Sequence, residues 1–282
     1  MSSVSPAVAI AAHRPARERP RREVAALARI EGRRLLLHPV FLLGLALSML
    51  FFRDEGNGAT WEAFVDGFAY LPLACGTLVA ANLGALRSRR DRTDELYESM
   101  PRPRSSRVAG QLLGLLWTLP IAGALMAAAR IDNSFVVDNL GVLHAPSPGQ
   151  LVQGPLMIIT FGAIGILLAR IAPSPIVGAV AVVALIAARL PGLIPAGSIG
   201  AWLVPIATDV FQYAPSTPCD PGTSSGCHRV ATSAIAWHLS YFFGLTLLAA
   251  AAAMIPRRRP LGFAAVAALA VALAAATRLA AG

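Results

Sequence analysis

Long unbroken runs of apolar residues constrain this chain more than any other feature of its sequence. The runs are about 18 to 25 residues long, the length that an α-helix needs to cross a bilayer. They show neither the alternation of a half-buried strand nor a single apolar helix face. Charged residues supply only 14% of the positions, and mean hydropathy is +0.61, whereas soluble domains carry nearly twice that charge. The sequence therefore predicts a polytopic integral membrane protein.

Seven candidate spans follow one another in a transmembrane domain over residues 35–280. The bilayer core admits only helices or closed barrels, and these runs are too long for barrel strands, so we expect an all-α transmembrane bundle. A shorter apolar segment, 198–212, contains Pro205 and is interpreted as a re-entrant segment on the extracellular side. The expected spans are about 35–52, 64–86, 108–129, 151–169, 176–194, 232–255 and 261–280.

The N-terminal segment is polar and rich in arginine. Residues 1–20 contain three prolines, so we expect a disordered basic tail. In 21–34, apolar residues alternate with charged ones such as Glu31, Arg33 and Arg34, which predicts an amphipathic helix at the membrane interface. The segment lacks the short charged region and cleavage site of a secretory signal, so we expect it to stay attached.

The basic residues set the expected orientation of the spans. The net charge of +9 would suggest nucleic acid as a partner of a soluble protein, but here the arginines flank the spans. With a cytoplasmic N-terminus, all of them fall on the inner side except Arg53, Arg130, Arg189, Arg229 and Arg278. This follows the positive-inside rule and places the C-terminus outside. An excess of Arg over Lys, with much Ala, Gly and Pro, favours a bacterial plasma membrane.

Several kinds of chemistry are excluded by missing motifs. The chain has no Lys, so it cannot contain a phosphate-binding P-loop and we expect it to bind no ATP by itself. It contains no H-E-x-x-H motif and no paired carboxylates within the spans. Its one G-x-S-x-G match, GTSSG at 222–226, lies in the polar outer loop between Cys219 and Cys227, outside the expected spans. We therefore assign no catalytic residue, no metal ligand and no cofactor, and expect the protein not to be an enzyme.

The inner segment 87–107 is the most informative polar stretch. Its centre, 91–100, carries the signals of a short helix with an acidic first turn and an apolar face, ended by Pro101. Such a helix is suited to docking into a groove on a soluble partner, and the alternative is an ordinary positive-inside loop with one helical turn. The residues are Thr93 as the N-cap, Asp94 and Glu95 in the first turn, and Leu96, Tyr97 and Met100 as the apolar face.

Three runs of sequence resemble a known family. EGRRLLLHPVFLLGLAL, DELYESMPRPRSSRVAGQLLG and GAIGILLARIAPSPIVGAVA, in this order, are similar to permease subunits of ABC exporters of the type-two class from actinobacteria. The resemblance covers about 21–260. It implies an interfacial helix at 21–34, a coupling helix at 91–100 and an outer re-entrant segment at 198–212. The family core has six spans, so the seventh is a departure from it.

The resemblance also implies partners and a function. The chain would form the translocation path of an exporter as a homo- or heterodimer of permease subunits, together with a separate cytoplasmic ABC ATPase that uses ATP and Mg. Two alternatives stay open. One is a non-transporting membrane anchor or assembly subunit. The other is an ion-coupled carrier, which would need buried carboxylates, whereas the expected spans contain a single one, Asp66, near the outer end of 64–86.

The outer loop TPCDPGTSSGCHRV contains two of the three cysteines, Cys219 and Cys227. On the oxidising side of a membrane we expect them to form a disulfide. A metal site would recruit His228, but two Cys and one His provide no fourth ligand.

Overall fold

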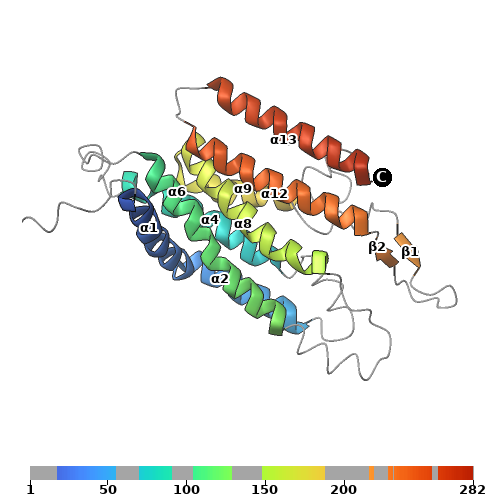
Figure 1. Ribbon diagram of the computed structural model, residues 1–282. Coiled ribbons are helices and arrows are strands. Elements are labelled where there is room, and N and C mark those ends of the chain that lie inside the picture. The colour runs from blue at the N-terminus through green and yellow to red at the C-terminus, as the bar shows by residue number, and fades with distance from the viewer. Residues whose placement is uncertain are drawn as a thin grey trace, which may run out of the picture.

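The computed structural model describes residues 18–54, 70–90, 104–128, 148–187, 216–218, 228–230, 232–255 and 260–281. Nearly all of these residues are helical, and the helices form an elongated bundle (Figure 1). Three described helices are long and apolar enough to cross a membrane, and a bent helix pair brings the number to four if it counts as one span. This agrees with the prediction of a helical membrane protein. The three are Ser105–Ala128, Leu151–Ile171 and Ile235–Met254.

The elements follow the expected order with shifted boundaries. They are α1 (Glu18–Leu36), α2 (Pro39–Asp54), α4 (Leu71–Arg90), α6 (Arg104–Gly114), the 3₁₀ turn η4 (Leu115–Trp117), the helical residues 118–128, α8 (Pro148–Ile171), α9 (Pro175–Ala187), α12 (Thr232–Met254) and α13 (Pro260–Ala281). The first helix begins inside the segment expected to be disordered, at Glu18, and the first expected span is broken before Pro39. The expected re-entrant segment 198–212 lies outside the described residues.

Helices α4 and α8 form the centre of the bundle and run in the same direction. Near their first turns, Gly154 of α8 lies against the ring of Tyr70, which directly precedes α4. Further along both helices, Gly165 lies so close to the middle of α4 that a Cβ atom there would collide with the carbonyl oxygen of Leu78. Glycine therefore sets the distance between the two backbones, as is common in membrane bundles that have little hydrophobic force between helices.

Helix α12 runs parallel to α8 on the other side. The hydroxyls of Thr160 and Thr246 share a hydrogen bond of 2.7 Å. Near the C-terminal ends of both helices, Arg170 Nη2 donates to the carbonyl oxygen of Ile255 at 3.4 Å. Because the residue numbers of both partners rise from the first contact to the second, α8 and α12 run in the same direction. Helix α13 packs on the outer side of α12 (Figure 1).

Helix α2 packs antiparallel to α4. A Cβ atom on Gly76 would lie 2.8 Å from the carbonyl oxygen of Val40, while nearer the start of α4 the backbone N–H of Leu73 donates to Ser48 Oγ at 3.1 Å. The N–H of Leu73 belongs to the first turn of α4, where no carbonyl within the helix is available to accept it. Ser48 thus caps α4 from a neighbouring helix.

Buried hydroxyl groups in the bundle are satisfied locally. Thr77 and Thr118 each donate to a backbone carbonyl oxygen three or four residues earlier, at 2.7 Å. In the Thr160–Thr246 pair one hydroxyl donates to the other, and the hydroxyl that accepts donates to its own backbone carbonyl oxygen four residues earlier, at 2.8 Å. An unpaired hydroxyl in an apolar environment costs several kcal/mol. These bonds let small polar residues lie inside the core without destabilising it.

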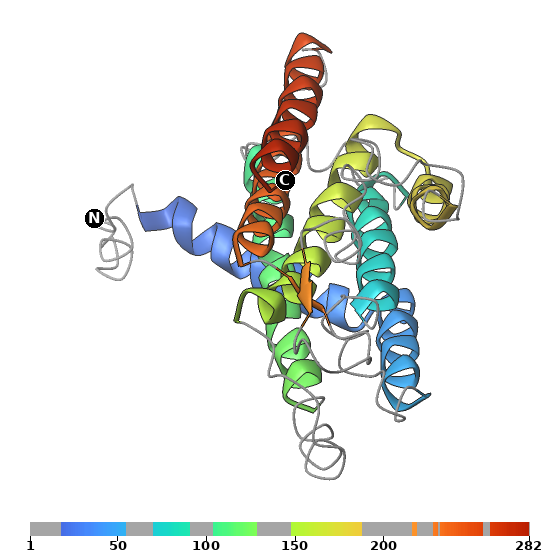
Figure 2. The ribbon, with the colours of Figure 1, turned by 90° about the vertical axis from the view of Figure 1, so that its right-hand side faces the viewer.

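Helix α1 crosses α6 at an interface made of small residues, which we call the α1–α6 seam: Ala28 and Gly32 of α1 with Gly110 and Gly114 of α6. A Cβ atom on Gly114 would lie 3.0 Å from the backbone nitrogen of Gly32 and 3.3 Å from the carbonyl oxygen of Ala28. A Cβ atom on Gly32 would collide with the indole of Trp117. Each helix contributes a small-x-x-x-small pair, so the backbones touch. Figure 2 shows α1 lying crosswise to the bundle.

A short antiparallel strand pair, β1 (Ser216–Pro218) and β2 (His228–Val230), was not expected from the sequence. Its register pairs Pro218 with His228. Cys219 and Cys227 themselves lie outside the described residues, so their disulfide stays a prediction.

Candidate functional site

The chain bends by 58° between α1 and α2, at a two-residue elbow, Leu37 and His38. A residue that precedes proline is disfavoured in the helical region, and Pro39 has no N–H to continue the ladder of α1. His38 then begins the next helix: its carbonyl oxygen accepts from the N–H of Leu42 at 3.0 Å, and its Nδ1 accepts from the N–H of Val40 at 3.3 Å. His38 is therefore the N-cap of α2.

Acceptance of a hydrogen bond at Nδ1 requires that this nitrogen carries no proton. An imidazole that accepts in this way is neutral. His38 thus acts as a structural cap at the elbow and adds no positive charge.

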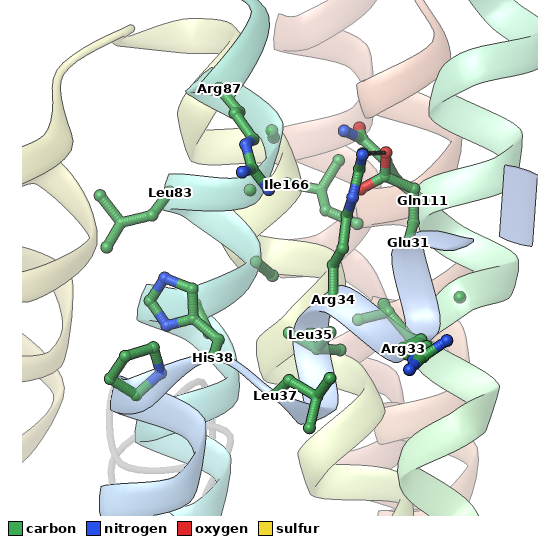
Figure 3. A pocket seen from close by; sticks show the side chains of 17 residues that line it. Glu31, Arg33, Arg34, Leu35, Leu37, His38, Leu83, Arg87, Gln111 and Ile166 are labelled. Carbon is green, nitrogen blue, oxygen red and sulfur yellow. Dashed lines mark hydrogen bonds and ion pairs between the residues drawn. The ribbon is translucent and has the colours of Figure 1, made fainter. Parts of the chain in front are cut away.

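A cavity of about 720 Å³, the elbow pocket, opens beside this bend (Figure 3). Its size falls within the range of small-molecule sites, roughly 300 to 1,000 Å³. Five helices and the elbow form its wall, so residues far apart in the sequence meet there. The lining residues are Glu31, Arg33, Arg34, Leu35, Leu37, His38, Pro39, Ala80, Ala81, Leu83, Gly84, Ala85, Arg87, Gln111, Gly114, Leu115 and Ile166.

The polar part of the pocket carries a positive charge. Figure 3 shows Arg34 from α1 and Arg87 from α4 extending toward the same space from opposite sides, and Gln111 of α6 beside Arg34. Among the described residues, Glu31 is the one carboxylate that lines the pocket, and it forms an ion pair with Arg34 at 3.3 Å. The Arg34 side chain is 54% exposed, so this pair contributes little to stability. The arginines outnumber the carboxylate.

The deep part of the pocket is apolar. Leu35, Ala80, Ala81, Leu115 and Ile166 line it, and all five are buried in the bundle core. The pocket therefore has two chemical halves, an arginine-bearing rim and a hydrocarbon floor. Such a division fits an amphiphile better than a uniformly polar solute.

Only part of the predicted site can be located. Glu31, Arg33 and Arg34, predicted from the sequence as interfacial residues, all line the elbow pocket, although Arg33 points away from Arg34 in Figure 3. His38, Arg87 and Gln111 were not predicted as site residues. The coupling candidates Thr93, Asp94, Glu95, Leu96, Tyr97 and Met100 lie outside the described residues.

Helices α8 and α12 each bury a further polar side chain. His238 is buried, with its ring 4.7 Å from that of Phe242. Gln153 is also fully buried, and neither of its amide atoms has a hydrogen-bond partner within the described part of the chain. Neither residue lines the elbow pocket. Within the described ranges, no group of three or more His, Cys, Asp or Glu side chains is placed to hold a metal ion.

Comparison with known proteins gives no family for this chain. No protein-family model matches it, and no curated protein matches it in sequence.

Proposed function

We propose that this protein is the membrane-spanning permease subunit of an ATP-driven ABC exporter of the type-two class, located in a bacterial plasma membrane with its N-terminus in the cytoplasm. It pairs with a second permease copy, identical or related, and with a separate cytoplasmic ATPase that binds ATP and Mg. The resemblance of three sequence runs supports this proposal, and so does one feature of the helix packing.

That feature is the α1–α6 seam. Helix α6 begins at Arg104, four residues after the last coupling candidate, Met100. A force applied to the segment 93–100 by a docked ATPase would act directly on α6. Because the backbones of α6 and α1 touch at the seam, the displacement would pass to α1 and, through the elbow, to α2. This is the mechanical connection that an ATPase-driven permease needs.

The directions of the helices support a family-like core of six spans. Helices α8 and α12 are parallel, so the chain between Ile171 and Thr232 has to return once across the bundle. Helix α9 starts this return with 13 apolar residues. With α13 added after α12, we propose seven spans and an extracellular C-terminus.

Transport would follow from a shift between inward-facing and outward-facing conformations, driven by ATP binding to the partner. The ion-coupled alternative is disfavoured, because the buried polar side chains of the described residues are hydroxyls, amides and one imidazole, with no carboxylate. A permease and a non-transporting anchor would both bind the ATPase, so the test measures ATP hydrolysis as well as ATPase binding.

We expect Leu96→Asp to abolish co-purification of the protein with its ATPase. A carboxylate placed in an apolar groove is buried without a partner and costs several kcal/mol. Glu95→Arg should weaken the complex less, by about 1 kcal/mol or less, because a charge at the rim of an interface is screened. The measurement is the amount of ATPase retained per permease, together with ATP hydrolysis by the retained complex.

Ser3→Asp, in the expected disordered tail, is the control for an added negative charge and should behave as wild type. If Leu96→Asp retains the ATPase with full hydrolysis while the protein stays folded in the membrane, the segment 93–100 is not a coupling helix. If every variant retains the ATPase but the rate of ATP hydrolysis is the same with and without this protein, the protein is a non-transporting anchor and not a permease.

A further inference from the structure

We propose that the elbow pocket binds the phosphate-bearing headgroup of an anionic phospholipid, with Arg34 and Arg87 as the groups that contact the phosphate. This inference goes beyond the exporter proposal and does not rest on it, because an anchor or a carrier with this pocket would bind the lipid equally. Three properties of the pocket support it: its charge, its apolar floor and its depth.

The first property is charge geometry. A phosphate diester carries one negative charge on two oxygens, which matches the planar fork of N–H donors on a guanidinium. Arg34 and Arg87 approach one space from opposite helices, so a single phosphate between them would meet donors on both sides (Figure 3). The Glu31 carboxylate pairs with Arg34 at one edge, and Gln111 adds an amide donor beside it.

The second property is the floor beneath the arginines. A soluble phosphate would leave the apolar surface of Ala80, Ala81, Leu115 and Ile166 facing water. The glycerol backbone and the first methylene groups of a lipid would cover this surface instead, and each buried methylene contributes about 0.8 kcal/mol to binding. The floor therefore favours a lipid over free phosphate as the source of the phosphate group.

The third property is depth. Arg87 lies three residues before the end of α4, or about 4.5 Å along the helix axis, and Ile166 lies five residues before the end of α8, or about 7.5 Å. The headgroup layer on each side of a bilayer is about 5 to 8 Å thick. If these helices end at the membrane surface, the rim lies in the headgroup layer and the floor at the start of the hydrocarbon.

Glycines on two helices provide a matched test. A Cβ atom on Gly84 would meet nothing within 4 Å, and Gly84 lines the pocket, so Gly84→Phe should fill the cavity without displacing a helix. A Cβ atom on Gly123 also meets nothing within 4 Å, but Gly123 does not line the pocket. Gly123→Phe is therefore the control for an added ring. The role of charge is tested with the double variant Arg34→Gln, Arg87→Gln. Its control is Arg29→Gln, because Arg29 is an exposed arginine of α1 that does not line the pocket.

The experiment is native mass spectrometry of the full chain in detergent, titrated separately with phosphatidylglycerol and phosphatidylcholine. We expect the wild type to bind the first phosphatidylglycerol about tenfold more tightly than phosphatidylcholine, because phosphatidylcholine has the same phosphate but also a choline ammonium that two guanidinium groups repel. The preference should disappear in the double arginine variant, which lacks these charges, and in Gly84→Phe, which fills the pocket. Gly123→Phe and Arg29→Gln should keep it.

Two results would overturn the proposal. If the double arginine variant and Gly84→Phe both retain the wild-type preference, the lipid binds elsewhere. If millimolar inorganic phosphate or glycerol phosphate displaces phosphatidylglycerol completely, the pocket is a site for soluble phosphate. Because no ATPase is present in this experiment, its failure leaves the exporter proposal untouched, and loss of the exporter proposal leaves the lipid site untouched.

Discussion

Gly165→Val is expected to prevent the protein from forming a stable bundle. A Cβ atom at this position would collide with the carbonyl oxygen of Leu78 and lie 3.0 Å from its carbonyl carbon, and this backbone belongs to the central helix α4. A backbone inside a packed helix pair cannot move away as a flexible side chain does, so α4 and α8 would have to separate. Separation would also break the bond from Asn82 Nδ2 to the carbonyl oxygen of Gly165, 3.3 Å long.

We expect a loss of about 3 kcal/mol or more in the free energy of unfolding, at the upper end of what overpacking costs. Thermal unfolding in detergent, followed by size-exclusion chromatography, measures it. Gly123→Val is the control, because valine there enters open space. The account of the α4–α8 contact is wrong if the two variants unfold at the same temperature.

Gly114→Leu should release α1 from the bundle while the rest of the protein stays folded. Among the described elements, α1 has its most extensive contact with α6, and the added side chain would enter the space occupied by Gly32 and Ala28. We expect amide hydrogen exchange in α1 to become about a hundredfold faster, which corresponds to a loss of roughly 3 kcal/mol of local stability. Exchange in α8 should not change.

Gly123→Leu, in the same membrane-capable helix Ser105–Ala128, adds the same side chain away from the seam and should leave α1 protected. Equal protection of α1 in both variants would show that the seam does not hold this helix. The proposed path from the segment 93–100 to the elbow would then have no physical basis.

The presence of membrane-capable helices was predictable from the sequence, because hydropathy is a local property of each segment. Of the seven expected spans, three coincide with described helices that are long and apolar enough to cross a membrane. The sixth expected span, 232–255, matches α12 to within one residue. The elbow was harder to predict. The prediction placed His38 and Pro39 inside a continuous first span, because hydropathy does not depend on whether a helix bends. The bend is set by two local effects: a residue before proline avoids the helical conformation, and the His38 side chain accepts a hydrogen bond from the N–H of Val40.

The elbow pocket was only half predictable. Arg33 and Arg34 stand out in the sequence as polar residues of an amphipathic helix, but nothing local indicates that Arg87 and Gln111 meet them. That meeting depends on which helices pack together. Small residues such as Gly114 permit close packing without specifying the partner, so the α1–α6 seam follows from tertiary structure alone.

If this chain works with a separate ATPase, a complex reconstituted in liposomes should show it. The chain is co-expressed with a candidate P-loop ATPase, and both the subunit ratio and Mg-dependent ATP hydrolysis are measured with and without the permease. We expect a complex of two permease and two ATPase subunits whose hydrolysis rate differs from that of the free ATPase. A chain that purifies without the ATPase, and leaves its hydrolysis unchanged when mixed with it, is not the permease of an ABC exporter.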